Sequence, residues 1–199
     1  MLGCPLGFGG QHLRVGEARG MEMMDKRLAA IVYPATKGAL ADYLLVEVAN
    51  RLQGLRLQLA GAVQLNTHRA DRRRCDMSMR DLSSGELVEI SEYRGPQARG
   101  CRLDHRALED MVGLSKAAVD RGADLLIVNR FGKREAKGQG FRQTIDAAIT
   151  KGIPVLTTVG PDNLTHWRNY TADFAEELPV DLTCAMAWCL RTARTAQYA

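Results

Sequence analysis

The amino-acid sequence predicts a three-layer α/β sandwich, in which a mainly parallel β-sheet lies between two layers of helices. Short, wholly apolar segments, of which residues 123–128 are the clearest, are typical of strands that are buried on both faces. Amphipathic segments with helical spacing separate these strands, and that alternation indicates a parallel sheet. The polar–apolar alternation of Cys75–Leu82 breaks the pattern and predicts an inserted β-hairpin around residues 75–91.

The elements are expected in the following order. The first strand is predicted at residues 28–33, because this apolar run is followed by the turn residues Pro34 and Gly38. A helix is expected over residues 39–52, where apolar side chains recur at helical spacing. A second strand follows at residues 57–65, and the hairpin comes after it.

Asp104 is expected to cap the next helix, which runs to about Arg121, because an aspartate side chain accepts hydrogen bonds from the free N–H groups of a first turn. The remaining elements are expected as strands at 123–128, 153–158 and 173–178 and as helices at 141–150, 162–170 and 181–196.

Length and composition are those of one globular domain: 199 residues, of which 46% are hydrophobic and 25% charged. We expect a single domain over residues 25–199, preceded by a flexible extension over residues 1–24. The five cysteines are odd in number and include no C-x-x-C pair, so neither a disulfide framework nor a zinc ribbon is indicated. This use of cysteine predicts a reducing, cytoplasmic compartment. No apolar run approaches the roughly 20 residues that span a bilayer, so no membrane partner is expected.

The charge balance is mildly basic, with 27 Lys and Arg against 23 Asp and Glu. A net charge of +4 suits a phosphate or another oxyanion and falls short of a nucleic-acid-binding signature. The arginine run at residues 69–74 is more typical of an exposed tip between two strands than of a nucleic-acid contact. The histidines have no metal-binding spacing, so no metal site is predicted.

Two loops follow strands and precede helices, which is where an α/β sheet usually binds its ligands. The first covers residues 33–42 and the second residues 129–140. A helix N-terminus at either place would favour an anion, because its backbone N–H groups are free. The alternative for the first loop is a plain turn with Lys37 in solvent.

The second loop carries a resemblance to a known family. The segment from residue 123, ADLLIVNRFGKREAKGQG, resembles the Walker B region of the small nucleoside-triphosphatases of the THEP type. The segment from residue 77, MSMRDLSSGELVEI, resembles their hairpin, and the likeness covers about residues 28–178. The chain is more closely similar to an uncharacterised bacterial family related to these enzymes, whose members are often labelled nucleotide-binding or molybdate-transport associated. The resemblance implies a P-loop NTPase-like fold.

The chain departs from the nucleotide-hydrolysing motifs of those enzymes. Of the phosphate loop, Gly38 alone matches a required glycine. Ala41 stands where the phosphate-binding lysine belongs, and Asp42 stands where the Mg²⁺-binding hydroxyl belongs. Asn129 and Arg130 replace the metal-holding and water-activating acids. No catalytic residue is therefore assigned, no cofactor is expected, and Mg²⁺ would bind only together with a nucleotide.

The leading hypothesis is an accessory or regulatory protein that binds a nucleotide or a small oxyanion, phosphate or molybdate-like, through Thr36, Lys37, Gly38, Arg99, Arg102, Asn129, Arg130 and Lys133. Alternatively these groups are solvated loop charges or structural partners of Asp104 and Glu135. Two other functions stay open: an active nucleoside-triphosphatase in which Lys37 reaches the phosphate, and an interaction module that kept the fold and lost the ligand. The sequence carries no signal for the oligomeric state.

Overall fold

The computed structural model describes residues 26–67, 76–91 and 103–196, and these residues form one seven-stranded sheet in the order β4-β3-β2-β5-β6-β1-β7. Five neighbouring strands, from β2 to β7 in that order, are parallel, whereas β3 and β4 form an antiparallel hairpin at the edge beside β2. The strands are β1 Leu28–Val32, β2 Leu59–Thr67, β3 Asp76–Asp81, β4 Leu87–Glu89, β5 Leu125–Val128, β6 Val155–Val159 and β7 Ala175–Leu178. The predicted sandwich and its inserted hairpin are confirmed.

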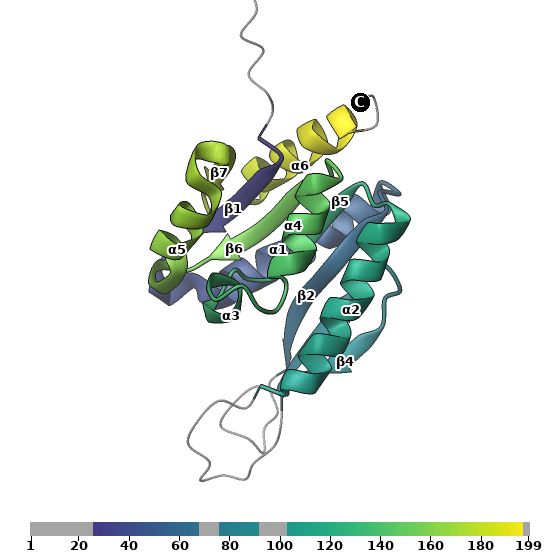
Figure 1. Ribbon diagram of the computed structural model, residues 1–199, viewed down its shortest axis with the longest axis vertical. Helices are drawn as coiled ribbons and strands as arrows, with labels where there is room; N and C mark the ends of the chain where they lie inside the picture. The colour runs from purple at the N-terminus through teal and green to yellow at the C-terminus, as the bar shows by residue number, and fades with distance from the viewer. Residues whose placement is uncertain (1–25, 68–75, 92–102, 197–199) are drawn as a thin grey trace, which may run out of the picture.

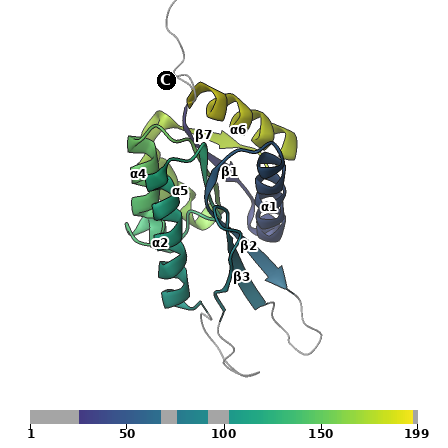
Figure 2. The ribbon, with the colours of Figure 1, turned by 90° about the vertical axis from the view of Figure 1, so that its right-hand side faces the viewer.

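Helices cover both faces of this sheet (Figures 1 and 2). Helices α1 and α6 lie on one face, and α2, α4 and α5 lie on the other. Their bounds are α1 Gly38–Gly54, α2 His105–Arg121, α3 Lys133–Ala136, α4 Arg142–Thr150, α5 Pro161–Thr171 and α6 Leu182–Ala196. Short 3-10 turns at Ala35–Lys37 and Ala172–Phe174 precede α1 and β7. The layers are therefore helix, sheet, helix.

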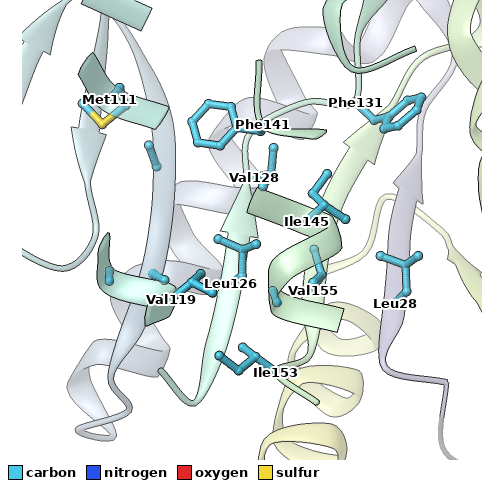
Figure 3. Close-up of a cluster of buried hydrophobic side chains, with 14 of the residues drawn as sticks. Leu28, Met111, Val119, Leu126, Val128, Phe131, Phe141, Ile145, Ile153 and Val155 are labelled. Atoms are coloured by element: carbon cyan, nitrogen blue, oxygen red, sulfur yellow. The ribbon is translucent and has the colours of Figure 1, made fainter. Parts of the chain in front are cut away.

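Each face of the sheet has its own hydrophobic core, and strand β5 shows why its sequence is apolar throughout. Leu125 and Ile127 belong to the core under α1 and α6, whereas Leu126 and Val128 belong to the core under α2 and α4 (Figure 3). Successive side chains of a strand point to opposite faces, so a strand covered on both sides needs an apolar residue at every position.

The helix boundaries follow local signals. Asp104 caps α2 as expected, because its carboxylate accepts hydrogen bonds from the N–H groups of Arg106 at 2.9 Å and Ala107 at 3.1 Å.

The four-residue helix α3 is an addition to the predicted elements. The predicted extension over residues 1–24 and the arginine run at 69–74 lie outside the described residues. No helix in the described part of the chain is long and apolar enough to cross a membrane.

From the neighbouring strands β1 and β6 the chain continues in opposite directions across the sheet. Strand β1 continues through α1, on one face, to β2, which lies three places away beyond β6 and β5. Strand β6 continues through α5, on the other face, to β7 on the far side of β1. The carboxyl ends of β1 and β6 therefore form the point at which the winding of the sheet reverses, which is the usual ligand position in open α/β sheets.

Candidate functional site

Three strand ends meet where the winding reverses. Tyr33 follows β1, Asn129 and Arg130 follow β5, and Gly160 follows β6. Backbone hydrogen bonds hold these ends together: Tyr33 N–H to Val159 O at 3.2 Å and Phe131 N–H to Thr158 O at 2.8 Å. We call the group of Tyr33, Gly38, Asp42, Asn129, Arg130 and Gly160 the switch-point site.

Asp42, in the second turn of α1, lies at the centre of a hydrogen-bond network. Its side chain is buried, and its Oδ1 accepts from Arg130 Nη2 at 2.8 Å and from Asn129 Nδ2 at 3.1 Å. Its Oδ2 accepts from Asn66 Nδ2 at 3.4 Å. Because a buried carboxylate needs compensating donors, this network explains how α1 tolerates an aspartate against the sheet.

Asn129 connects this network to the neighbouring strand. Its Oδ1 accepts a hydrogen bond from the backbone N–H of Gln64 on β2 at 2.9 Å, while its Nδ2 donates to Asp42. Both the oxygen and the nitrogen of the buried Asn129 amide therefore have hydrogen-bond partners inside the protein.

The sequence alternative that the basic residues pair with Asp104 and Glu135 is wrong for Arg130, whose acidic partner is Asp42. Asp104 is occupied as the α2 cap. The buried Glu135 carboxylate accepts from two backbone N–H groups, those of Gly132 at 3.0 Å and Phe141 at 3.1 Å, and so closes the loop around α3.

Arg130 keeps part of its guanidinium in solvent although it pairs with Asp42. Its side chain is 39% exposed, whereas that of Asp42 is 7% exposed. Its Cζ lies 5.6 Å from the centroid of the Tyr33 ring, within the range of a cation–π contact. Its Nε is buried without a hydrogen-bond partner. Arg130 therefore has donor capacity that the protein itself does not use.

The Tyr33 ring packs between two glycines that begin helices. A Cβ atom on Gly160, which precedes α5, would lie 3.1 Å from the Tyr33 Cζ and hydroxyl oxygen, and one on Gly38 would lie 3.6 Å from the ring. Burial raises the pKa of Tyr33, nearby Asp42 and Asp162 add to that rise, and Arg130 opposes it. The phenol therefore stays protonated at neutral pH.

The two helices that begin at the site have no side-chain caps. Neither Lys37, at the N-cap of α1, nor Gly160, at the N-cap of α5, gives a side-chain cap hydrogen bond, in contrast to Asp104 at α2. The first-turn N–H groups of a helix carry partial positive charge and are satisfied by a cap, by water or by a ligand. The switch-point site thus combines two helix N-termini with one arginine.

The structure brings some of the predicted site residues together and separates others. Thr36 and Lys37 are exposed in the 3-10 turn beside Gly38, and a Cβ on Gly38 would lie 4.0 Å from Arg130 Nη2. Among the described residues, the Lys37 side chain has no hydrogen-bond or ion-pair partner, whereas its backbone N–H donates to Pro34 O at 2.8 Å. Lys133 is exposed at the start of α3. Arg99 and Arg102 lie outside the described residues.

Sequence reasoning placed Tyr33 in the first candidate loop without giving it a role, and it missed Gly160 as part of the site and Asp42 as the partner of Arg130. One signal was available: Gly160-Pro161-Asp162 follows an apolar strand and precedes a helix, as the two chosen loops do. The proximity of Gly160 to Tyr33 depends on β6 lying beside β1, and strand order is not written in local sequence patterns. Within the described ranges, no group of three or more His, Cys, Asp or Glu side chains could hold a metal ion.

Comparison with known proteins gives a family and one distant functional relative. The chain is 31% identical over 167 residues to the Molybdenum import ATP-binding protein ModC 2 of Bradyrhizobium diazoefficiens. The match covers 84% of this chain and 18% of that protein, so the chain spans less than a fifth of its relative's length. No solved structure matches. The model of the family described as Protein of unknown function (DUF2478) matches residues 28–188, which include all seven strands, and the chain therefore belongs to this family.

Proposed function

We propose that this protein binds a small oxyanion, phosphate or molybdate-like, or the phosphate of a nucleotide, at the switch-point site, and acts as a cytoplasmic accessory or regulatory protein. The observation that carries the proposal is Arg130: it is held by Asp42 beside the first turn of α1, and part of its guanidinium is exposed. An arginine fixed by a buried carboxylate is oriented in advance for a second anion.

Charge at the site supports an anionic ligand. Asp42 alone would repel an anion, but its charge is compensated by Arg130 at 2.8 Å. Lys37 then remains as a positive charge without a partner among the described residues, at the beginning of α1. The uncapped first turns of α1 and α5 add partial positive charge at the same strand ends.

The comparison supports the same class of ligand. The relative's name couples molybdenum import to ATP binding, and its matching segment is 31% identical to this chain. Together with the strand–loop–helix arrangement after β1 and β5, this supports a relation to P-loop nucleoside-triphosphatases, and we propose descent from the THEP type with altered motifs. Molybdate and phosphate are both tetrahedral oxyanions, so one set of donors serves either.

We do not propose that the protein hydrolyses a nucleotide. Phosphoryl transfer needs a metal-holding acid and a group that orients water. Asn129 and Arg130 stand in those places, and both are hydrogen-bonded to Asp42. A guanidinium cannot act as a base at neutral pH. We therefore expect binding without turnover.

One observation favours a competing function, that of a protein-interaction module. Leu40 and Tyr43, three positions apart on α1, are 47% and 66% exposed. Residues three apart lie on one face of a helix, so the two side chains form a small apolar surface near the proposed ligand position. A partner protein that docks there would not need any small ligand.

The test is a thermal-shift screen of the full chain with phosphate, molybdate, tungstate, ADP, ATP and GTP, each with and without Mg²⁺, while phosphate release is followed in the same samples. A ligand at 100 times its dissociation constant adds about 2.7 kcal/mol of stability. Stabilisation without released phosphate supports the proposal. Mg²⁺-dependent turnover contradicts it, and no response to any anion favours the interaction module.

Two variants locate the bound anion. Arg130→Gln and Lys37→Ala are expected to weaken binding at least fivefold each, because each removes a positive charge from the site. Arg121→Ala is the matched control, since Arg121 is an exposed residue at the end of α2, just before the amino-terminal end of β5, whereas the site lies at the carboxyl ends of the strands. Equal loss of affinity in all three variants would indicate unspecific electrostatic binding.

A further inference from the structure

Four residues beside Arg130 form a closed ring of hydrogen bonds. Asn129 Nδ2 donates to Asp42 Oδ1 at 3.1 Å, and Asn129 Oδ1 accepts from the backbone N–H of Gln64 at 2.9 Å. Gln64 Nε2 donates to Asn66 Oδ1 at 2.8 Å, and Asn66 Nδ2 donates to Asp42 Oδ2 at 3.4 Å, which closes the ring. Gln64 donates at both of its contacts and Asp42 accepts at both, so every contact has one donor and one acceptor. We call these four residues the amide ring.

Two members of the amide ring lie on a part of β2 that the parallel sheet does not hold. Strand β5 pairs with β2 over residues 59–62, whereas β3 pairs with it over residues 62–67. Residues 63–67 and 76–80 therefore form a two-stranded extension, which we call the hairpin arm, and it extends past the other strands in Figure 2. The amide ring thus joins the hairpin arm to α1 and to the end of β5.

Arg130 is connected to the amide ring through Asp42. Arg130 Nη2 donates to Asp42 Oδ1, the oxygen that also accepts from Asn129, while Oδ2 accepts from Asn66. The carboxylate is therefore held at both oxygens, and the hydrogen bond at Oδ2 comes from the hairpin arm. If Asn66 is removed, the carboxylate is free to turn about its Cβ–Cγ bond, and Arg130 turns with it. A guanidinium that is already held in place binds a second anion more tightly than one that must first be ordered.

We propose that the amide ring couples the hairpin arm to the anion at Arg130, with Asn66 as the positioning residue. This inference rests on the proposed function and adds a regulation of the same site. A hairpin arm that is held in the ring favours the bound anion, and by thermodynamic linkage the bound anion holds the hairpin arm to the same extent. Any change that moves the arm away from Asp42 then lowers the affinity for the anion without contact to it.

The experiment measures hydrogen exchange by NMR on the full chain, with and without sodium molybdate or sodium phosphate, and the affinity for the same anions by calorimetry. The reporter is the backbone N–H of Gln64, because it donates to Asn129 inside the ring. The bound anion is expected to slow its exchange about fivefold in the wild type. Asn66→Ala should speed this exchange in the ligand-free protein, abolish the slowing by the anion and weaken anion binding about three- to tenfold. Asn66→Asp should weaken binding further, because it replaces the donor to the carboxylate by a second negative charge.

Thr67→Ala is the matched control, because Thr67 is the next residue of β2, is exposed and points to the opposite face of the strand. Its affinity and exchange should equal those of the wild type. If the wild type binds an anion and both Asn66 variants bind it as tightly as the control does, the coupling is refuted while the proposed function stands. A bound anion that leaves the exchange of the Gln64 N–H unchanged in the wild type also refutes the coupling. If the wild type binds neither anion, the proposed function fails and the coupling fails with it.

Discussion

Asp42 is the residue whose role changes most between the sequence and the structure. In the sequence it stands where a P-loop enzyme has a Mg²⁺-binding hydroxyl, and there its charge argues against a phosphate ligand. In the structure three side chains donate to it, from the ends of β2 and β5. Its carboxylate therefore holds α1 against the sheet and orients the Arg130 side chain. Arg130 remains partly exposed to solvent while it pairs with Asp42.

The coupling between Asp42 and Arg130 can be measured with a double-mutant cycle of Asp42→Asn and Arg130→Gln. Each single variant should lower the free energy of unfolding by about 1–3 kcal/mol, because each leaves a partly buried group without its partner. The double variant should lose less than the sum, with a coupling energy of about 1–3 kcal/mol. Urea denaturation measures all four proteins.

The control cycle uses Glu47→Gln and Arg51→Gln, an exposed pair one turn apart on α1 at 2.7 Å. Its coupling energy should be at most about 0.5 kcal/mol, as for other exposed helix pairs. Strict additivity of the Asp42 and Arg130 variants would show that the two charges act independently, and the explanation for the buried aspartate would then be wrong.

At the scale of elements, the contact between β2 and β5 depends on a glycine. Gly61 on β2 has φ of +99°, and a Cβ there would lie 1.9 Å from the carbonyl oxygen of Ile127 on the paired strand. No side chain fits that space. Gly61 O also accepts from the N–H of Leu82, so the same residue joins the parallel sheet to the hairpin end.

Gly61→Ala is therefore expected to lower the free energy of unfolding by about 2–5 kcal/mol, from the unfavourable φ together with the displaced strand. Gly113→Ala is the matched control, because this α2 glycine is exposed and a Cβ there would meet nothing within 4 Å. The control should gain about 0.5–1 kcal/mol from higher helix propensity. Urea denaturation curves compare the two, and similar stabilities would contradict the strand geometry.

Helix α3 is a helix that the sequence patterns did not predict. Its four residues are too few for helical periodicity to be visible. What holds it is the buried Glu135 carboxylate, together with Gly138 and Gly140 at φ of +77° and +58°. The sequence predicts a charged loop for this segment. No local pattern distinguishes a glutamate whose carboxylate accepts hydrogen bonds from backbone N–H groups from a glutamate on the surface.

At the scale of the whole molecule, the two hydrophobic cores are separated by the sheet, and each contains one tryptophan. Trp167 of α5 lies in the core on one face, and Trp188 of α6 lies in the core on the other. A single domain over residues 25–199 remains a prediction, and these two side chains allow it to be tested, because each reports on a different layer.

If the chain is one cooperative unit, Trp167→Phe and Trp188→Phe will each unfold with a fluorescence midpoint that coincides with the midpoint from far-UV circular dichroism. Each variant is its own control, because both probes are recorded on the same sample and any loss of stability moves them together. A difference between the two midpoints within either variant would show that the two layers unfold separately, and the single-domain prediction would be wrong.

The sequence by itself determined the class of fold and the nature of nearly every element. It could do so because a strand buried on both faces is apolar throughout, as Leu125 to Val128 are, and an amphipathic helix repeats every 3.6 residues. It also indicated that loops after β1 and β5 would bear the site, since these follow strands and precede helices. Thr36, Lys37, Gly38 and Arg130 were predicted in this way, and their role in binding stays a prediction.

Only the tertiary structure decided which of those groups meet. Arg130 and its partner Asp42 are 88 positions apart, and Tyr33 meets Gly160 because β6 lies beside β1. Strand order results from packing of the whole sheet, and no local pattern encodes it. A buried charge and its partner are likewise chosen by three-dimensional proximity, because the free energy of burying an ion depends on every donor around it and not on its neighbours in sequence.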